Sequence, residues 1–362
     1  MHVPDGFINV PVSAAAGVVA AGAVAVSLKG ARRELDERTA PLAGLVAAFI
    51  FAVQMLNFPV ATGTSGHLLG GALAAILVGP FTGVLCVSVV LLMQGVLFAD
   101  GGLTALGVNI SDMAIVTTVV AYLVFRGLVK ALPRGRRSIT VASFAAALLS
   151  VPAAAVAFTL IYAVGGTTDV SLGKVATAMV GVHVLIGIGE AVITALTVGA
   201  VIAVRPDLVY GARGLTKPLK LRVGGELVDA PAAADGPAPV AAGPATRKVS
   251  TRKVWIAGIV ASLVLAGFVS FYASADPDGL EKVAHDKGID KKAEEHAAAD
   301  SPLADYGVKD ITDARVSGGL AGIIGVGVTV VAGSAVFWTL RRRRTGDTAP
   351  AAMPESVTSE KA

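Results

Sequence analysis

Residues 67–80 read HLLGGALAAILVGP, and the apolar part, 68–79, is too short to cross a lipid bilayer. At about 1.5 Å per residue, a helix over this run is about 18 Å long, whereas a hydrocarbon core is about 30 Å thick. Pro80 separates it from the next apolar run, because the residue before a proline disfavours the helical region. We therefore expect a short helix in a bundle of longer ones, which needs a loop that dips inward to meet it.

The chain must enter that bundle to reach a short helix, and the preceding residues suit an irregular path. Residues 57–67, NFPVATGTSGH, are apolar but rich in Gly, Pro and Thr. Irregular backbone at membrane depth survives only inside protein or beside a cavity. We expect residues 59–67 to fold into the bundle and to carry His67 inward with them.

Eight further apolar segments accompany this one, and the composition predicts an all-α polytopic membrane protein. Hydrophobic residues make up 54% of the 362 residues and charged residues only 15%, whereas soluble domains are about a quarter charged. The net charge of +4 is small and the basic residues cluster between apolar runs, which argues against a nucleic-acid partner. The other segments are 8–28, 42–58, 81–98, 106–125, 140–164, 175–204, 254–274 and 317–340.

The basic residues predict how the segments cross the membrane, because cytoplasmic loops are enriched in Lys and Arg. Basic clusters follow the first, fifth, seventh and ninth segments, and the last cluster is Arg341–Arg344. The alternate loops 59–67 and 99–105 carry neither residue type, and 165–174 carries only Lys174. Nine crossings, with the short segment counted, place the N-terminus outside and the C-terminus in the cytoplasm.

A Pro/Ala/Gly-rich stretch, 223–246, divides the segments into two groups and is expected to be disordered. Seven segments before it form a predicted core bundle, and two after it form a helical module with a charged external loop, 275–316. The predicted organisation is a core at 1–210, a cytoplasmic linker at 211–253, a two-helix module at 254–340, and a basic stop with a disordered tail at 341–362.

The chain begins MHVPDGF, and a histidine at position 2 offers metal chemistry. The Met1 amine, the His2 main-chain nitrogen and His2 Nδ1 can close five- and six-membered chelate rings on one ion, and planar nitrogen sites suit Ni(II) or Cu(II). Pro4 and Gly6 predict a specific turn, and one further imidazole, such as that of His67, would complete a square. The alternative is a frayed, exposed terminus. A cleaved signal peptide is disfavoured because no basic residue precedes the apolar run.

A second candidate site lies in the seventh segment. His183 and Glu190 are seven residues apart and so share one helix face, and ionisable residues inside a membrane are functional candidates. The structural alternative is a His–Glu pair satisfied by a neighbouring helix. His285 and His296, in the charged loop, are expected to be solvated, with at most a weak role in metal capture. Cys86 has no predicted role.

Four blocks within the first 210 residues resemble the substrate-binding membrane subunits of energy-coupling-factor transporters for cobalt and nickel. The blocks are MHVPDGF (1–7), GTSGHLLGG (63–71), FADGGLTALGVNISDMA (98–114) and HVLIGIGEA (183–191). In the C-terminal module, DPDGLE (276–281) resembles the motif of the PDGLE domain, which is related to the small accessory subunit of these systems. We expect this module to pack against the core and to present its charged loop at the external mouth.

The resemblance implies that an ion is held by the Met1 amine, the His2 amide nitrogen and imidazole, and the His67 imidazole. It implies that this ion is Ni(II) or Co(II), taken up from outside, and that the chain carries no prosthetic group. Imidazole ligands need partners that orient them. The candidates for that role are Ser65, Asn109 and Asp112.

The chain has no GxxxxGK[ST] phosphate loop, so energy must come from an ion gradient or from other subunits. The resemblance implies a transmembrane coupling subunit and two cytoplasmic ATPases at the cell membrane, with the face of His183 and Glu190 structural or close to the ligands. A gradient-driven secondary metal transporter that uses His183 and Glu190 is the alternative. An intramembrane metalloprotease lacks support because no HExxH motif occurs, and no enzyme activity is expected.

Overall fold

The computed structural model describes residues 1–35, 40–215, 220–223, 226–229 and 250–346. Most of the linker and the tail 347–362 lie outside the described residues, so the disorder expected there stays a prediction. One part of the linker is described: β3 (Lys220–Val223) pairs with β4 (Glu226–Asp229) in an antiparallel hairpin. This hairpin differs from the disorder expected across the linker, and it sets Lys220 opposite Asp229.

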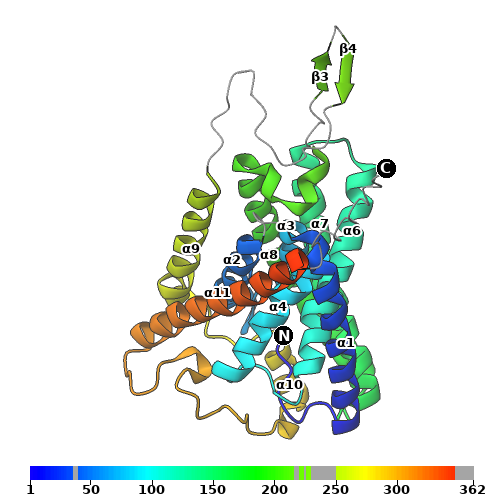
Figure 1. Cartoon of the computed structure of the whole chain (residues 1–362). Helices are drawn as coiled ribbons and strands as arrows, with labels where there is room; N and C mark the ends of the chain where they lie inside the picture. Colours follow the sequence, from blue (N-terminus) through cyan, green and yellow to red (C-terminus); the bar gives the residue numbers. More distant parts are fainter. Residues whose placement is uncertain (36–39, 216–219, 224–225, 230–249, 347–362) are drawn as a thin grey trace, which may run out of the picture.

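Each of the nine predicted apolar segments forms a helix, and the chain is a polytopic all-α membrane protein (Figure 1). Within the described residues, seven helices are long and apolar enough to cross a membrane, whereas α2 and α3 are shorter. The helices are α1 (Val10–Glu34), α2 (Ala40–Gln54), α3 (Gly71–Val78), α4 (Pro80–Leu97), α5 (Leu106–Asn109) continuing through the π-helix η1 (Ile110–Val116) into α6 (Thr117–Ala131), α7 (Arg136–Gly165), α8 (Leu172–Val204), α9 (Thr251–Gly267) and α11 (Ala314–Gly346).

The helix α3 is short, as the sequence predicts, and all eight of its residues are buried inside the core. Gly71 packs against α6: a Cβ there would overlap the Thr117 side chain and lie 2.8 Å from Thr118 N. On the side of α4, a Cβ on Gly83 would lie 2.9 Å from Ala75 N. These glycines let three helix backbones approach closely, as small residues do in membrane bundles.

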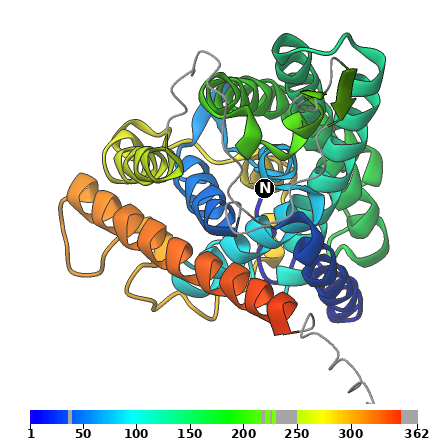
Figure 2. The same ribbon diagram turned by 45° about the horizontal axis from the view of Figure 1, so that its top comes forward.

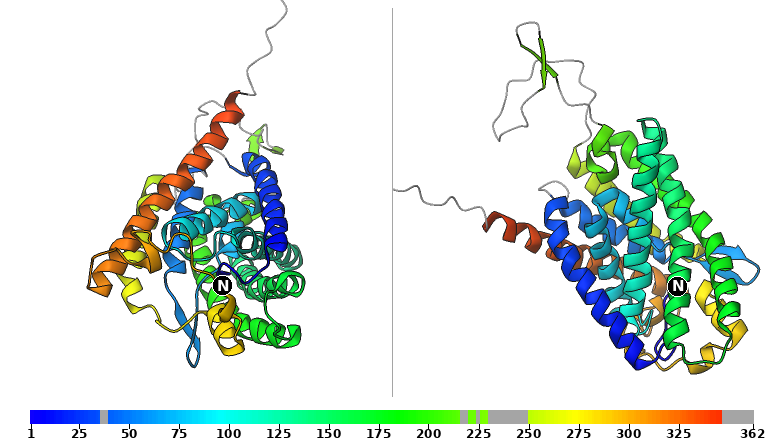
Figure 3. Two further views of the ribbon diagram at one scale, coloured as in Figure 1. Left: turned by 90° about the horizontal axis from the view of Figure 1, so that it is seen from below. Right: turned by 90° about the vertical axis from the view of Figure 1, so that its right-hand side faces the viewer.

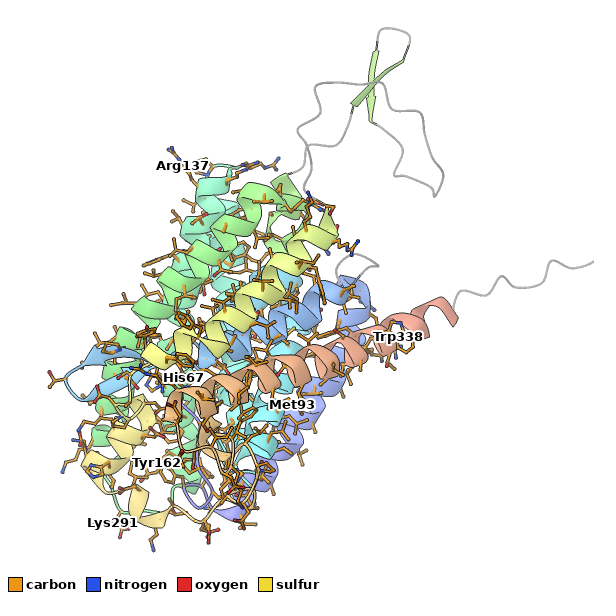
Figure 4. All side chains as sticks on the ribbon, turned by 90° about the vertical axis from the view of Figure 1, so that its left-hand side faces the viewer. His67, Met93, Arg137, Tyr162, Lys291 and Trp338 are labelled. Atoms are coloured by element: carbon orange, nitrogen blue, oxygen red, sulfur yellow. The ribbon has the colours of Figure 1, made fainter. Side chains whose placement is uncertain are left out.

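The residues before α3 form a hairpin, and only its returning strand is buried in the bundle (Figure 4). β1 (Phe58–Ala61) pairs with β2 (Thr64–Gly66), and β2 is buried whereas the tip between them is exposed. Gly66 lies so close to α8 that a Cβ would overlap Ile186. The prediction that the whole loop folds inward is right for β2 and wrong for the tip. A hairpin satisfies much of its own backbone, so its tip can extend away from the bundle.

The C-terminal module packs against the core, as expected. Helix α11 runs obliquely across the bundle and lies along α2 (Figures 1 and 2). At this crossing a Cβ on Gly333 would lie 3.2 Å from Gly44 Cα. Between the two long helices of the module, a Cβ on Gly322 would overlap the carbonyl group of Ala266 in α9. The close approach of these helices therefore depends on glycine at each crossing.

The amino-terminal segment and loops that are predicted to be external share one end of the bundle (Figure 3). Gly102 N donates to Val3 O at 2.9 Å. Glu294, in the loop of the C-terminal module, donates its main-chain N–H to Asp5 O at 3.0 Å. The loops are grouped as the predicted topology requires, and the side of the membrane that this end faces stays a prediction.

The substitution Gly71→Ala should destabilise the protein, because the added methyl group does not fit against Thr117. Overpacking of this kind typically costs about 1–3 kcal/mol. We expect a lower midpoint of thermal unfolding for the purified protein in detergent. Gly127→Ala in α6 is the matched control, since a Cβ there meets no atom within 4 Å. Equal midpoints for the two variants would contradict the close packing of α3.

Candidate metal centre

The first three residues are buried rather than frayed: Met1 is 2% exposed, His2 8% and Val3 0%. Asn109 bonds the main chain twice, because Val3 N donates to Asn109 Oδ1 at 2.7 Å and Asn109 Nδ2 donates to Val3 O at 3.2 Å. The main-chain N–H of Gly102 also donates to Val3 O. The alternative of an exposed terminus is therefore wrong, and the terminal peptide has a fixed position.

A turn directs the terminus into the protein. The Asp5 carboxylate accepts the main-chain N–H of Thr104 at 2.8 Å and that of Leu103 at 3.3 Å. Gly6 has φ of +85°, a region that favours glycine, and a Cβ there would overlap Lys292 O. The predicted turn is present, and the loop of the C-terminal module covers it.

The Met1 amine, the His67 imidazole and the Asp278 carboxylate meet in a buried cluster, in the region where Figure 4 labels His67. Met1 N lies 2.7 Å from His67 Nε2 and 2.6 Å from Asp278 Oδ2, and the last two atoms are 3.5 Å apart. The His2 ring stacks on that of His67, with centroids 5.1 Å apart and planes inclined by 21°. His67 Nδ1 faces Leu68 O at 3.0 Å. That carbonyl favours a proton on Nδ1 and leaves Nε2 as the ligand atom.

The cluster can hold one divalent metal ion. His2, His67 and Asp278 each offer one ligand atom, and these three atoms lie within 4.8 Å of one another. Ligand atoms bound to one ion at about 2.1 Å are at most about 4.2 Å apart. A contraction of about half an ångström would bring all three into range. Imidazole and carboxylate ligands suit divalent transition metals, so the geometry supports such an ion at predicted residues and at one unpredicted carboxylate.

The His2 imidazole is held by a closed ring of polar contacts. His2 Nδ1 lies 3.1 Å from Asp100 Oδ1, and His2 Nε2 lies 3.2 Å from Gln94 Oε1. Tyr306, from the C-terminal module, donates its hydroxyl to Asp100 and accepts from Gln94 Nε2 at 2.9 Å. Burial outweighs the opposing charge of Asp100 and lowers the pKa of His2 to about 4. The imidazole is therefore neutral near pH 7 and carries one N–H, so it donates to one of these two oxygens and not to both. Nδ1 must leave Asp100 to take the ligand position predicted from the sequence.

Asp278 carries the negative charge that balances the buried Met1 ammonium. Burial by itself would raise the pKa of Asp278, but the Met1 ammonium and His67 outweigh it and hold this pKa well below its usual range. The two carboxylate oxygens have separate partners. Oδ2 faces Met1, whereas Oδ1 accepts two main-chain N–H groups at the start of α10 (Gly279–Lys287).

The three residues predicted to orient the ligands lie in different surroundings. Asn109 holds the backbone of Val3 rather than an imidazole ring. Ser65 donates its hydroxyl to Asp276 O at 2.7 Å and so positions the DPDGLE turn. Asp112 is fully buried in η1, and neither of its carboxylate oxygens has a hydrogen-bond partner among the described residues. Two of the three thus contact segments that carry ligand atoms, and Asp112 bonds none of them.

His183 and Glu190 are both buried in α8, but they bond to different groups. His183 Nδ1 faces Met179 O at 2.7 Å, within its own helix. Glu190 accepts the main-chain N–H of Leu69 at 2.7 Å and that of Gly70 at 3.1 Å. These amides stand at the start of α3, where helix N–H groups lack partners. Glu190 therefore anchors the end of the loop that carries His67.

The two histidines of the external loop differ in their surroundings. The His285 side chain is 79% exposed, as expected. His296 is partly buried: its Nε2 faces Gly101 O at 3.1 Å, and its Nδ1 accepts from Ala298 N at 2.9 Å. The expectation of a solvated His296 is wrong, because the loop folds onto the end of the core beside the terminal segment.

No prediction from the sequence named Asp278, Asp100, Gln94 or Tyr306. Asp278 had a local signal, since an Asp followed three residues later by Glu predicts a reciprocal helix cap. That cap is present, with Asp278 N donating to Glu281 Oε2 at 2.8 Å. The other three come from separate segments of the chain, so no local pattern connects them with the terminus.

Residues 2–208 match the family described as the cobalt uptake substrate-specific transmembrane region, CbiM. The chain belongs to this family. Residues 252–342 match the PDGLE domain, so the chain is a CbiM core fused to a PDGLE domain, and the resemblance noted in the motifs is confirmed. His2 and His67 lie in the CbiM core and Asp278 in the PDGLE domain, so the candidate metal centre spans both.

Relatives of the CbiM core are named for metal transport. A Haloquadratum walsbyi protein named for metal transport is 40% identical over 212 residues, which is 58% of this chain and 94% of that protein. An Archaeoglobus fulgidus protein named for fused nickel transport, NikMN, is 41% identical over 211 residues, 58% of this chain and 68% of that protein. A crystal structure of a transition metal transporter is 28% identical with a TM-score of 0.50, over 56% of this chain and 93% of that one.

Glu190→Gln should destabilise the CbiM core without removing a ligand. The amide has one acceptor oxygen where the carboxylate has two, and its NH2 group would face an N–H at the start of α3. Loss of a hydrogen bond to a charged group typically costs about 1.5–3 kcal/mol. We expect a lower midpoint of thermal unfolding in detergent. Thr177→Ala, which alters an exposed hydroxyl of the same helix, is the control, and a wild-type midpoint for Glu190→Gln would refute the anchoring role.

Proposed function

We propose that this CbiM–PDGLE chain is the substrate-specificity subunit of an ATP-driven transporter and captures Ni(II) or Co(II) at the external face of the cell membrane. One observation carries the proposal: inside the protein, Met1 N and His67 Nε2 are 2.7 Å apart and the His2 ring stacks on His67. Two ligand atoms at right angles on one ion, each at about 2 Å, are about 2.8 Å apart. The amine and the imidazole therefore have the spacing of neighbouring ligands.

The proposed ligand set is the Met1 amine, the His2 main-chain nitrogen, the His2 imidazole and the His67 imidazole. The first three close two fused chelate rings, which holds the nitrogens in one plane. The bonds of Asn109 to Val3 support this role, because they fix the peptide next to the chelate. The amine and the amide must each lose a proton, so metal binding releases protons and weakens as the pH falls.

The proposed cargo is Ni(II) or Co(II). Planar nitrogen coordination favours Ni(II) over Co(II), and Cu(II) would bind such a site more strongly than either. Selection of Ni(II) or Co(II) over Cu(II) must then depend on the shape of the pocket or on the supply of each metal. The family description names cobalt and one relative is named for nickel, which supports keeping both ions.

Transport across the membrane requires partners in this proposal, because the chain carries no phosphate loop. The proposed partners are a transmembrane coupling subunit and two cytoplasmic ATPase subunits. Val18 and Val19 of α1 are 74% and 62% exposed, so this helix presents apolar side chains to the membrane, where lipid or a partner helix can cover them. The chain itself is proposed to bind and deliver the ion.

A residue added before Met1 should abolish Ni(II) binding, because it removes the terminal amine from the chelate. His2→Ala and His67→Ala should have the same effect. Each loss should exceed the roughly 10–100-fold expected for a residue that only orients a ligand. Isothermal titration of each purified full-length variant with NiCl2 measures the loss of affinity. The control is His285→Ala, at an exposed position.

Two results would decide against this proposal. Retained binding in His67→Ala would exclude the chelate as the site. Loss of binding in a folded Glu190→Gln protein, with binding unaffected by a blocked amine, would instead favour a gradient-driven transporter that uses His183 and Glu190.

A further inference from the structure

Asp278 belongs to the PDGLE domain, yet its carboxylate lies among the proposed ligands of the CbiM core. Oδ2 is 2.6 Å from Met1 N and 3.5 Å from His67 Nε2. Ligand atoms around one ion at about 2.1 Å are separated by roughly 3–4 Å. The 3.5 Å to His67 Nε2 lies in this range, whereas the 2.6 Å ion pair with Met1 N must lengthen when a metal replaces the ammonium protons, and the carboxylate oxygen is then a further ligand beside both nitrogens.

The position of this carboxylate is fixed by its own motif. Asp278 Oδ1 accepts the main-chain N–H of Leu280 at 2.7 Å and that of Glu281 at 2.9 Å, which caps α10. Because Oδ1 is engaged by the helix, Oδ2 is directed to the cluster. One carboxylate oxygen of Asp278 therefore caps α10, and the other faces Met1 and His67.

The CbiM core holds the DPDGLE turn in place. Ser65, two residues before His67, donates its N–H to Pro277 O at 2.9 Å and its hydroxyl to Asp276 O at 2.7 Å. On the other side, Gly279 approaches α8 so closely that a Cβ would lie 2.5 Å from Val182 Cγ1. Any larger residue at this glycine would push the turn away from the ligands.

Charge gives the carboxylate a role in both states of the site. Without metal, Asp278 neutralises the Met1 ammonium. When a divalent ion is bound by a neutral amine, a deprotonated His2 amide and neutral imidazoles, the ion and its nitrogen ligands together carry a net charge of +1. A buried charge without a partner is costly, and Asp278 returns the total to zero. Two protons leave as one divalent ion enters, so the buried charge is unchanged.

A cavity of about 570 Å³ leads to the same place. It borders His2 on the core side and Pro277 and Leu280, close to Asp278 in the chain, on the other. Its lining includes the carboxylates of Asp276, Glu281 and Asp290 against the single ammonium of Lys282, and this excess of acidic groups favours a cation over an anion. An ion that follows this cavity meets the PDGLE turn and the terminal histidine together.

We propose that Asp278 is an additional oxygen ligand of the captured ion, so that the PDGLE domain completes a metal site shared by the two parts of the chain. This inference rests on the proposed function. It gives the fused domain a direct part in binding, and it converts a planar nitrogen set into one with an oxygen ligand beside it.

The test is Asp278→Asn in the full-length protein with a free amino terminus. Asparagine also caps helices, so the turn keeps its form while the charge and the ligand oxygen are altered. We expect affinity for NiCl2, measured by isothermal titration in detergent, to fall at least about tenfold, which corresponds to about 1.4 kcal/mol. We also expect the visible absorption spectrum of the Ni(II)-loaded protein at saturation to differ from that of the wild type. Asp278→Ser, a second capping residue, should behave alike.

Asp286→Asn is the matched control, because this exposed carboxylate lies on α10 and bonds Lys282 rather than the cluster. It should keep the affinity and spectrum of the wild type. Unchanged affinity in Asp278→Asn would overturn the inference. Weaker binding with an unchanged spectrum would also overturn it, since the carboxylate would then act from outside the coordination shell. Failure of the proposed function looks different: wild type and His67→Ala would bind Ni(II) equally, whatever stands at 278.

Discussion

The buried amino terminus is the constraint on which the rest of the site depends. A terminal ammonium inside a protein needs a partner, because an uncompensated buried charge costs several kcal/mol. Here Met1 N finds Asp278 Oδ2 at 2.6 Å and His67 Nε2 at 2.7 Å. Asn109 and Gly102 hold the main chain that leads to it. The terminus, the core and the PDGLE domain are therefore joined at one point, which is also where a metal ion would bind.

The short helix α3 makes room for this arrangement. A helix long enough to span the bilayer would leave no space for an inward loop, whereas α3, with only eight buried residues, leaves that space. The loop ends where Glu190 accepts two N–H groups at the start of α3. The buried Glu190 carboxylate, a candidate residue of a gradient-driven transporter, thus accepts hydrogen bonds from the backbone. These bonds hold the segment that carries His67.

The sequence was a good guide wherever one segment sufficed for the inference. The run 68–79 was recognised as short because its length could be compared with a bilayer. His2 was singled out because a chelate at this position would use adjacent atoms, and its role as a ligand stays a proposal. The exposed tip of the hairpin and the partly buried His296 were missed. Both depend on packing between segments far apart in the chain, which no local pattern records.

Local composition and covalent neighbours therefore determined the helices, their division into a core and a C-terminal module, and the nitrogen atoms that positions 1 and 2 offer to a metal. Tertiary structure alone decided which acidic group meets the amine. Asp278 is 277 residues from Met1 along the chain, and many acidic residues lie in the same charged loop. Only the cap of α10 and the contact of its turn with Ser65 select this one, because a carboxylate is placed by the backbone that carries it.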